Sequence, residues 1–251
     1  MTDPLDGIDL VVFDKDGTLI EFNAMWRDWA IELGERLSVA VGRDVRPPLY
    51  EMLGFDSATG MVRPHGGLAA TPMARIREMT QAILVAGGSS AAEAVAAGAV
   101  AWRAPDPETL ARPLADLRAL FLEIQSGGRS VAGGRSVAGG RSVAVATSDD
   151  REPTERTIAA LGLTDLVDAI VCADDGVPVK PAPDMVLQVC AVVGVAPART
   201  AVVGDSPADL RMGRAAGAGR VIGVLTGVGG RTDLEPLADL VIDSVADLRI
   251  A

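Results

Sequence analysis

The feature that most constrains the fold is a regular alternation of short apolar runs with helix-like segments in the second half of the chain. The apolar runs comprise residues 8–13 near the start of the chain and then residues 143–147, 169–173, 200–204, 221–225 and, more weakly, 240–242. Segments 153–161, 183–193 and 207–216 each carry a proline in the first turn and a glycine at or near the end, as helices do. This alternation predicts an α/β fold, in which helices cover both faces of a parallel sheet and the crossovers are right-handed.

Residues 22–122, between the first two predicted strands, do not follow this alternation. They are rich in Ala, Arg and Met, and no strand signal interrupts them. Helical spacing of apolar residues occurs at Met25, Trp26, Trp29, Ile31 and Leu33, and again over 73–85 and 110–124. An insertion of this size in a βα unit predicts a separate domain that covers the ends of the strands. We therefore expect residues 1–22 and 123–251 to form the core and residues 23–122 to form a mainly helical cap domain.

Length, hydropathy and charge narrow the class of protein. A chain of 251 residues has room for one large α/β domain or for a core with a smaller inserted domain. No stretch reaches the ~18 uninterrupted apolar residues of a membrane span, and the first residues lack a secretory signal, so we expect a cytoplasmic protein without a membrane partner. The formal net charge of −11 argues against a nucleic-acid partner.

Cysteine and histidine are scarce, and this scarcity excludes several kinds of site. Cys172 and Cys190 lie in apolar runs without metal-binding spacing, which favours reduced thiols in the core. His65 is the only histidine, so a Ser-His-Asp triad or a two-histidine zinc site would depend on a single residue. Carboxylate chemistry is the better hypothesis.

A hexapeptide, Gly-Gly-Arg-Ser-Val-Ala, occurs three times in succession over residues 127–144. Only the third copy continues directly into the second predicted strand, so the other two copies have the character of a tandem duplication. They are expected to form a tolerated flexible loop, or alternatively an ordered hairpin or helical extension whose edge supports self-association. A repeat of six residues preserves the alternation of strand faces if copies exchange.

Polar residues follow the ends of four predicted strands, and the carboxyl ends of parallel strands open into one crevice. These residues are Asp14 and Asp16 after the first strand, Thr147 and Ser148 after the second, Lys180 after the third, and Asp205 and Asp209 after the fourth. Gly17 frees the backbone of the first turn to approach a phosphate or a metal.

This set matches what phosphoryl transfer to a carboxylate requires. Asp14 is the expected nucleophile, and Asp16 is placed to protonate the leaving oxygen and then to activate water. Thr147 and Lys180 are expected to hold the phosphoryl oxygens, with Gly17 and Ser148 as further substrate contacts. A hard cation such as Mg²⁺ prefers oxygen ligands, for which the candidates are Asp14, Asp16, Asp205 and Asp209.

Each residue alone has a simpler explanation. An Asp-x-Asp-Gly pattern also occurs in turns and calcium loops, but an EF-hand is disfavoured because Gly17 comes at loop position four and Met25 would occupy position twelve. Asp205 alone could be a helix cap, and Lys180 alone a solvated loop charge. The order and placement of the whole set make it specific.

In that order the motifs resemble the four motifs of the haloacid dehalogenase superfamily. The matching segments are Asp-Lys-Asp-Gly-Thr-Leu at 14–19, Thr147 at its strand end, Lys-Pro-Ala-Pro-Asp at 180–184, and Val-Gly-Asp-Ser-Pro-Ala-Asp at 203–209. Residues 209–218 are similar in particular to the phosphoglycolate phosphatase-like branch. The resemblance implies a Rossmann-like core, Mg²⁺ dependence, an aspartyl-phosphate intermediate and a helical cap after the first motif. Dehalogenation is not expected, because the dehalogenases of the superfamily lack the aspartate that Asp16 matches.

Lys15 departs from this pattern, since its position is more often apolar in that branch. It is expected either to contact the substrate phosphate near the mouth of the crevice or to reach solvent. Further substrate contacts are expected in the cap, where cations and aromatic rings suit an anionic ligand, although packing or a solvated helix face explains most of them equally well. The candidates are Arg63 and His65, in a loop bounded by Pro and Gly, and also Trp26, Trp29, Arg75 and Arg77.

Three functions remain open from the sequence. The first is a Mg²⁺-dependent phosphatase that acts on a small soluble phosphomonoester, as a monomer or homodimer. The second is a sugar-phosphate mutase with the same site, which returns the phosphoryl group to the substrate. The third is a self-associating protein with a vestigial site, driven by the hexapeptide repeat.

Overall fold

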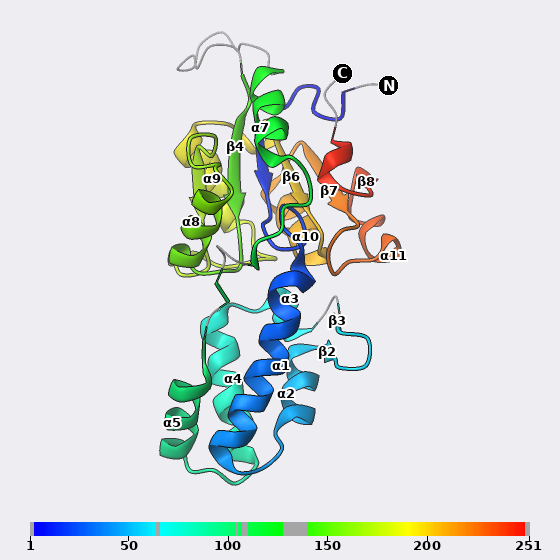
Figure 1. Ribbon diagram of the computed structural model, residues 1–251. Coiled ribbons are helices and arrows are strands. Elements are labelled where there is room, and N and C mark those ends of the chain that lie inside the picture. Colours follow the sequence, from blue (N-terminus) through cyan, green and yellow to red (C-terminus); the bar gives the residue numbers. More distant parts are fainter. Residues whose placement is uncertain (1–2, 64–65, 104, 107–109, 128–139, 249–251) are drawn as a thin grey trace. The chain divides into compact units, whose positions relative to one another are not determined.

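The chain folds into two compact units in the computed structural model, which describes residues 3–63, 66–103, 105–106, 110–127 and 140–248 (Figure 1). The sheet unit comprises Met1–Phe22 and Ala111–Ala251, and the inserted unit comprises Asn23–Leu110. The chain thus returns to the sheet unit at Ala111, earlier than the expected residue 123. The reason is helix α7 (Leu117–Ser126), which packs against the sheet and belongs with it.

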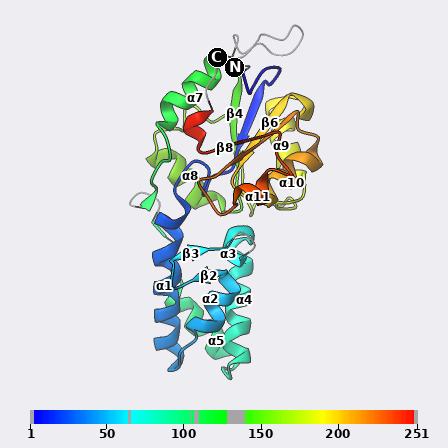
Figure 2. The ribbon, with the colours of Figure 1, turned by 90° about the vertical axis from the view of Figure 1, so that its right-hand side faces the viewer.

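The apolar run before Asp14 forms an inner strand of a parallel, six-stranded sheet, in the order β5-β4-β1-β6-β7-β8. Strands β4, β6 and β8 of this sheet are labelled in Figure 2. The strands are β1 (Leu10–Phe13), β4 (Ser142–Ala146), β5 (Ala169–Val171), β6 (Thr200–Gly204), β7 (Arg220–Val224) and β8 (Leu240–Ile242). Successive strands proceed from β1 to one side through β4 and β5, and then cross to its other side at β6. The strand order reverses beside β1, and this switch point is where open α/β sheets bind ligands. The α/β fold with a Rossmann-like parallel sheet is confirmed.

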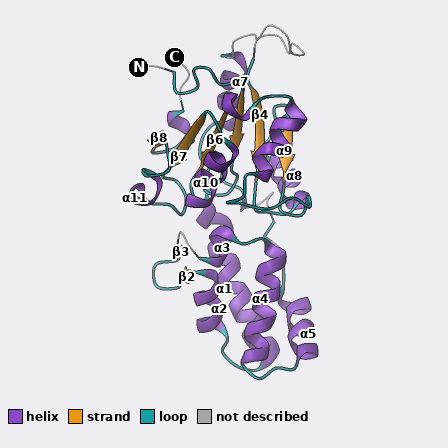
Figure 3. Ribbon diagram, turned by 180° about the vertical axis from the view of Figure 1, so that it is seen from behind, coloured by secondary structure: helices purple, strands orange, loops and turns teal. Residues whose placement is uncertain are grey.

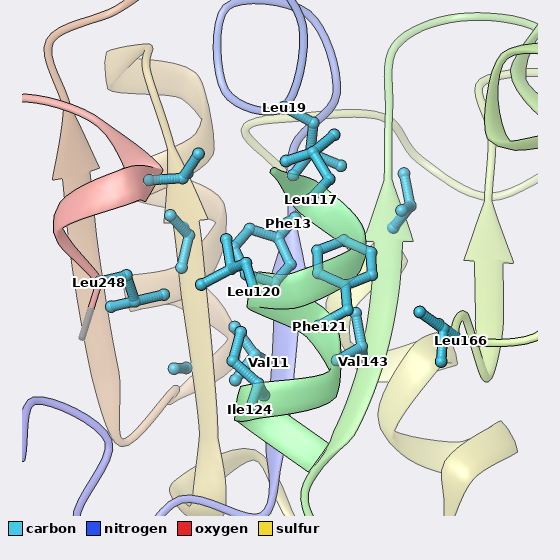
Figure 4. Packing of buried hydrophobic residues seen from close by; sticks show 14 of the residues in the cluster. Val11, Phe13, Leu19, Leu117, Leu120, Phe121, Ile124, Val143, Leu166 and Leu248 are labelled. Atoms are coloured by element: carbon cyan, nitrogen blue, oxygen red, sulfur yellow. The ribbon is translucent and has the colours of Figure 1, made fainter. Parts of the chain in front are cut away.

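Helices cover both faces of this sheet, because its strands are apolar on both sides. The helices of the sheet unit are α7, α8 (Arg151–Ala160), α9 (Asp184–Val193), α10 (Pro207–Ala216) and α11 (Arg231–Leu234), with short 3₁₀ turns at Pro197–Arg199 and Val245–Asp247. On one face Val11 and Phe13 pack against α7, where the ring of Phe121 stacks on Phe13 at 5.3 Å (Figure 4). On the other face Leu10 and Val12 pack in a cluster with residues of α9 and α10.

The expected helix over residues 110–124 is wrong in its first half. Residues 111–116 are not helical, and α7 begins only at Leu117, capped by the Asp116 side chain. Pro113 explains the break, since proline lacks the N–H that a helix interior needs. This segment runs antiparallel beside the chain that leaves the sheet: the Glu21 N–H donates to the Arg112 carbonyl at 2.9 Å, and Ile20 bridges Pro113.

The inserted unit is mainly helical, as Figure 3 shows. Its elements include α1 (Phe22–Val41, which begins at the unit boundary), α2 (Arg46–Leu53), α3 (Gly67–Ala70), α4 (Met73–Ala86) and α5 (Ala91–Ala101). The expectation that no strand interrupts this region is wrong, because β2 (Phe55–Asp56) and β3 (Met61–Val62) form an antiparallel hairpin. Strands of two residues are too short to leave an alternating pattern in the sequence.

The third hexapeptide copy leads into β4, as the sequence indicates. Arg141 of this copy is buried and pairs with Asp3 at 2.7 Å, while it donates to the carbonyls of Leu5 and Ile8. Residues 128–139, which contain most of the first two copies, lie outside the described residues. The expectations of a loop, hairpin or helical extension fall on these residues. Cys172 and Cys190 are buried free thiols, and burial raises the pKa of Cys172 to about 11. Within the described part of the chain, no helix combines the length and apolarity needed to cross a bilayer.

Candidate active site

The strand register places the predicted site residues at one edge of the sheet. Phe13 at the end of β1 pairs with Val145 of β4 on one side and with Val203 of β6 on the other. Asp14, Thr147 and Asp205 therefore emerge from neighbouring strands at their carboxyl ends, beside the switch point.

Three buried carboxylates and one ammonium form the centre of the site. Oxygen atoms of Asp14, Asp205 and Asp209 all lie within 4.8 Å of one another. Lys180, which lies between β5 and α9, places its Nζ 2.5 Å from Asp14 Oδ1 and 2.6 Å from Asp209 Oδ1. We call these four residues the acidic cluster. Its formal charge is negative even with the lysine included, so the cluster favours a cation.

Burial raises the pKa of two carboxyl groups of the acidic cluster, those of Asp14 and Asp205. It raises the pKa of Asp14 above the usual value, and the charge of Asp209 adds to this shift while Lys180 opposes it. Burial also raises the pKa of Asp205 well above its ordinary range. Repulsion from the charges of Asp14 and Asp209 raises this pKa further, as the next largest causes. Burial opposes the charged form of Lys180, but the two carboxylates beside it keep its pKa above that of a free lysine. A divalent cation would relieve the repulsion among the carboxylates.

Asp209 also fixes the start of α10. Its Oδ2 accepts hydrogen bonds from the N–H of Ser206 at 3.0 Å and from the Ser206 hydroxyl at 2.5 Å, in a reciprocal capping box. A Cβ on Gly204 would lie 2.3 Å from the Cβ of Asp209, so only glycine admits this close approach. One carboxylate therefore caps a helix and aligns Lys180 at the same time.

A glycine-containing loop after β7 holds Asp205 in place. The Val228 N–H donates to Asp205 Oδ2 at 2.8 Å, and the Thr18 hydroxyl donates to Oδ1 at 3.3 Å. Gly227 packs so closely that a Cβ there would lie 1.9 Å from Asp205 Oδ2. These contacts orient a carboxylate that, with Asp14 and Asp209, offers the oxygen ligands that Mg²⁺ prefers, so the residues present fit such an ion.

Gly17 serves this packing rather than exposing its own polar groups. Its φ is +88°, and a Cβ would lie 2.7 Å from Asp205 Oδ2. Its N–H donates to the Ile20 carbonyl, and its carbonyl accepts from the Thr226 hydroxyl at 2.6 Å. The turn can approach Asp205 only because residue 17 is glycine.

Asp16 lies outside the acidic cluster, although we expected it among the metal ligands. Its Oδ2 is 2.6 Å from the Nζ of Lys15, which lies 2.9 Å from Asp149 Oδ2 on its other side. Lys15 is 1% exposed, so the expectation that it reaches solvent is wrong. Burial, only partly offset by Lys15, raises the pKa of Asp16 to about 7.

Thr147 and Ser148 lie where the sequence predicts, directly after β4. Thr147 is buried, and its hydroxyl accepts a hydrogen bond from the Asp149 N–H at 3.2 Å. Because that bond uses an oxygen lone pair, the hydroxyl hydrogen remains available to a ligand. Ser148 is half-buried beside it.

The described candidates for substrate contact in the inserted unit are engaged within that unit. Trp26 and Trp29 are buried and meet edge to face, and Trp29 also packs on Trp102, so packing explains their spacing. The remaining described candidates have partners of their own: Arg63 pairs with Glu51, Arg75 with Glu78, and Arg77 lies over the ring of Trp102. His65 lies outside the described residues.

Two parts of the site were missed from the sequence. Asp149 follows Thr147 by two residues, so its place after a strand end was a usable signal. The second part is the loop that directly follows β7, formed by Thr226, Gly227, Val228 and Gly229. Its position after a strand end was again a usable signal, and its glycines strengthened that signal. Only the contacts of these residues with Lys15 and Asp205 reveal what they do.

Comparisons with known proteins agree with this architecture. The structure is similar to that of a predicted phosphoglycolate phosphatase from Haemophilus somnus (TM-score 0.64, 15% identity, 96% of each chain covered). It is also similar to β-phosphoglucomutase from Clostridium difficile (TM-score 0.58, 19% identity, 96% of this chain and 93% of the other). A third similar structure is a HAD family hydrolase from Deinococcus radiodurans with bound phosphate and sodium (TM-score 0.59, 20% identity, 97% and 94% covered).

At these identities the three structures establish the fold, whereas the sequence itself establishes the family. No curated protein sequence is significantly similar to the chain. The model of the haloacid dehalogenase-like hydrolases matches residues 8–217, which include Asp14, Thr147, Lys180, Asp205 and Asp209. The chain therefore belongs to the haloacid dehalogenase-like hydrolase family.

Proposed function

We propose that this protein is a Mg²⁺-dependent phosphatase that hydrolyses a small, soluble phosphomonoester through an aspartyl-phosphate on Asp14. The observation that carries the proposal is the buried acidic cluster of Asp14, Asp205, Asp209 and Lys180, with Asp16 two residues from the nucleophile. Uncatalysed hydrolysis of phosphate monoesters is extremely slow, so a catalyst needs several convergent groups.

In the first step, a carboxylate oxygen of Asp14 attacks phosphorus while the bond from phosphorus to the ester oxygen breaks. Asp16 gives its proton to that leaving oxygen, so the alcohol departs neutral. In the second step, water attacks the phosphorus of the aspartyl-phosphate and passes a proton to Asp16. The bond between Asp14 and phosphorus breaks, which restores the carboxylate and releases inorganic phosphate.

The remaining residues stabilise the charge that develops on the phosphoryl oxygens. The Thr147 hydroxyl has a free hydrogen to donate, and the Lys180 ammonium supplies a positive charge beside Asp14. Asp14, Asp205 and Asp209 would hold Mg²⁺, which offsets the repulsion between the nucleophile and the substrate phosphate. The raised pKa of Asp16, about 7, suits a group that must be protonated in one step and ionised in the next.

A phosphomutase is the second candidate, and the similarity to a β-phosphoglucomutase favours it. A mutase would use the same residues but return the phosphoryl group to the substrate. Analysis of the products distinguishes the two functions, because a phosphatase releases free phosphate from a sugar phosphate, whereas a mutase converts the sugar phosphate into an isomer.

The decisive experiment compares wild type with Asp14→Asn, using 4-nitrophenyl phosphate with Mg²⁺ and with EDTA. We expect Mg²⁺-dependent release of nitrophenol by wild type and none above background by Asp14→Asn, with the far-UV circular dichroism spectrum unchanged. Asp6→Asn is the matched control, because it removes an exposed carboxylate of the same unit and should keep full activity. Full turnover by Asp14→Asn would refute the proposal. A panel of metabolite phosphates would then identify the substrate.

A further inference from the structure

A buried ion triad links the turn after β1 to the turn after β4. Lys15 Nζ lies 2.6 Å from Asp16 Oδ2 and 2.9 Å from Asp149 Oδ2, and the lysine side chain is 1% exposed. The Asp149 backbone is itself fixed, since its N–H donates to Thr147 Oγ1 and its carbonyl accepts from the Ala173 N–H at 2.9 Å. Lys15 is thus tied through Asp149 to segments that follow β4 and β5.

The choice of lysine at this position stands out against the rest of the chain. Lys15 and Lys180 are the only lysines in the sequence, whereas arginine occurs throughout the chain. Both lysines are buried among carboxylates at the same sheet edge. An ammonium is a compact point charge, whereas a guanidinium is a broad planar fork that needs more space. Residue 15 therefore fits a site that requires a small buried cation.

Stability alone does not account for such a triad. Charges lose hydration when they are buried, and an apolar side chain of similar volume is often as stable or more stable in the same place. What the triad does provide is a fixed geometry for Asp16. Asp16 Oδ2 is held by Lys15, whereas Oδ1 is buried and has no hydrogen-bond partner among the described residues.

We propose that Lys15 and Asp149 are positioning residues that clamp Oδ2 of Asp16, so that Oδ1 is presented for proton transfer. The inference rests on the proposed function and adds to it a different role for each of the two lysines. Lys180 aligns the nucleophile Asp14, and Lys15 aligns the acid/base group. Asp149 keeps Lys15 in place and does not itself touch the substrate.

The test uses two aryl phosphates with leaving groups of different basicity. 2,4-Dinitrophenyl phosphate releases a stable anion and needs little protonation, whereas phenyl phosphate depends on a general acid. Values of kcat/KM report the step that expels the leaving group, so later hydrolysis of the aspartyl-phosphate does not obscure the comparison. We expect Lys15→Met and Asp149→Asn to lose about 10- to 100-fold more kcat/KM on phenyl phosphate than on 2,4-dinitrophenyl phosphate, in the same direction as Asp16→Asn.

Arg141→Met is the matched control, because it removes another buried cation of the same unit, paired with Asp3 at 2.7 Å. This control should change both substrates by the same factor. An equal loss on both substrates in Lys15→Met and Asp149→Asn would overturn the inference, since a structural role does not distinguish leaving groups. If Lys15→Met does not fold, Asp149→Asn and the double variant Lys15→Met/Asp149→Asn, which contains no unpaired ammonium at this site, carry the same comparison. Turnover by Asp14→Asn at the wild-type rate would instead refute the phosphatase proposal itself.

A second measurement does not depend on activity. Protein labelled with [ε-¹⁵N]lysine carries labelled side-chain ammonium groups at only two positions, 15 and 180. In NMR spectra we expect Asp149→Asn to shift the ammonium resonance of Lys15 and to leave that of Lys180 in place. We expect Asp209→Asn to do the reverse. A Lys15 signal that is unchanged in Asp149→Asn would overturn the clamp.

Discussion

Lys180 Nζ lies 2.5 Å from Asp14 Oδ1, and the same ammonium is 2.6 Å from Asp209. Both carboxylates are buried, so this lysine offsets charge that water cannot reach. Removing one member of a buried ion pair leaves the other uncompensated, at a cost of about 3–5 kcal/mol. We therefore expect Lys180→Met to lower the free energy of unfolding by an amount in this range when metal is removed with EDTA.

Mg²⁺ should restore part of that loss, because it supplies positive charge to the same carboxylates. The shift in urea midpoint on adding Mg²⁺, followed by far-UV circular dichroism, should be larger in Lys180→Met than in wild type. Arg118→Met serves as the control, since its pair with Asp165 is exposed and contributes little. Equal destabilisation of Lys180→Met with and without Mg²⁺ would contradict a cation site among these carboxylates.

Gly227 lies against Asp205 so closely that an alanine Cβ would be 1.9 Å from Oδ2. Gly227→Ala should displace either the loop or the carboxylate and so weaken Mg²⁺ binding. We expect a clear loss of the Mg²⁺-dependent rise in melting temperature, together with a loss of activity. Gly98→Ala is the matched control: the nearest atom to its Cβ is Gln81 Nε2 at 3.8 Å, so a helix-favouring alanine should maintain stability or raise it by up to about 1 kcal/mol. Unchanged Mg²⁺ affinity in Gly227→Ala would disprove this role of the loop.

Burial of Asp16 should make stability depend on pH in an unusual direction. Its pKa is raised from 3.8 to about 7, so between these values the folded protein keeps a proton that the unfolded chain has released. The folded state then binds more protons, and the free energy of unfolding falls as pH rises through this window. In EDTA, wild type should therefore lose stability relative to Asp16→Asn between about pH 4 and about pH 7, on the order of a few kcal/mol. Parallel pH profiles for the two proteins would show that Asp16 is not protonated by burial.

Much of the sheet unit could be predicted from the sequence, because its determinants are local. Apolar runs mark the strands, and the carboxyl ends of parallel strands must meet at one edge, which brings Asp14, Asp205 and Lys180 together. The boundary near residue 111 and the 55–62 hairpin were missed, because a single proline and two-residue strands leave weak patterns.

The surroundings of Lys15 could not be predicted for a different reason. Whether Lys15 turns to a phosphate, to solvent or to Asp149 depends on a contact between residues far apart in the chain. The sequence restricts that contact to one sheet edge but leaves the orientation of the side chain undetermined. Tertiary packing at that edge decides the orientation.

The two crossings between the units permit a direct test of what the inserted unit does. The chain leaves and re-enters the sheet unit side by side, since Glu21 N–H donates to the Arg112 carbonyl at 2.9 Å and Leu114 N–H donates to the Leu19 carbonyl. A short Gly-Ser linker can therefore join Phe22 to Ala111 in place of residues 23–110 without distorting the sheet. We expect the inserted unit to contribute to the choice of substrate, so its removal should leave Asp14-dependent hydrolysis of 4-nitrophenyl phosphate. Rates over a panel of metabolite phosphates should become more uniform, with higher KM for the best substrate. Retention of the wild-type order of preference, with the far-UV spectrum of a folded sheet unit, would show instead that the sheet unit alone sets specificity.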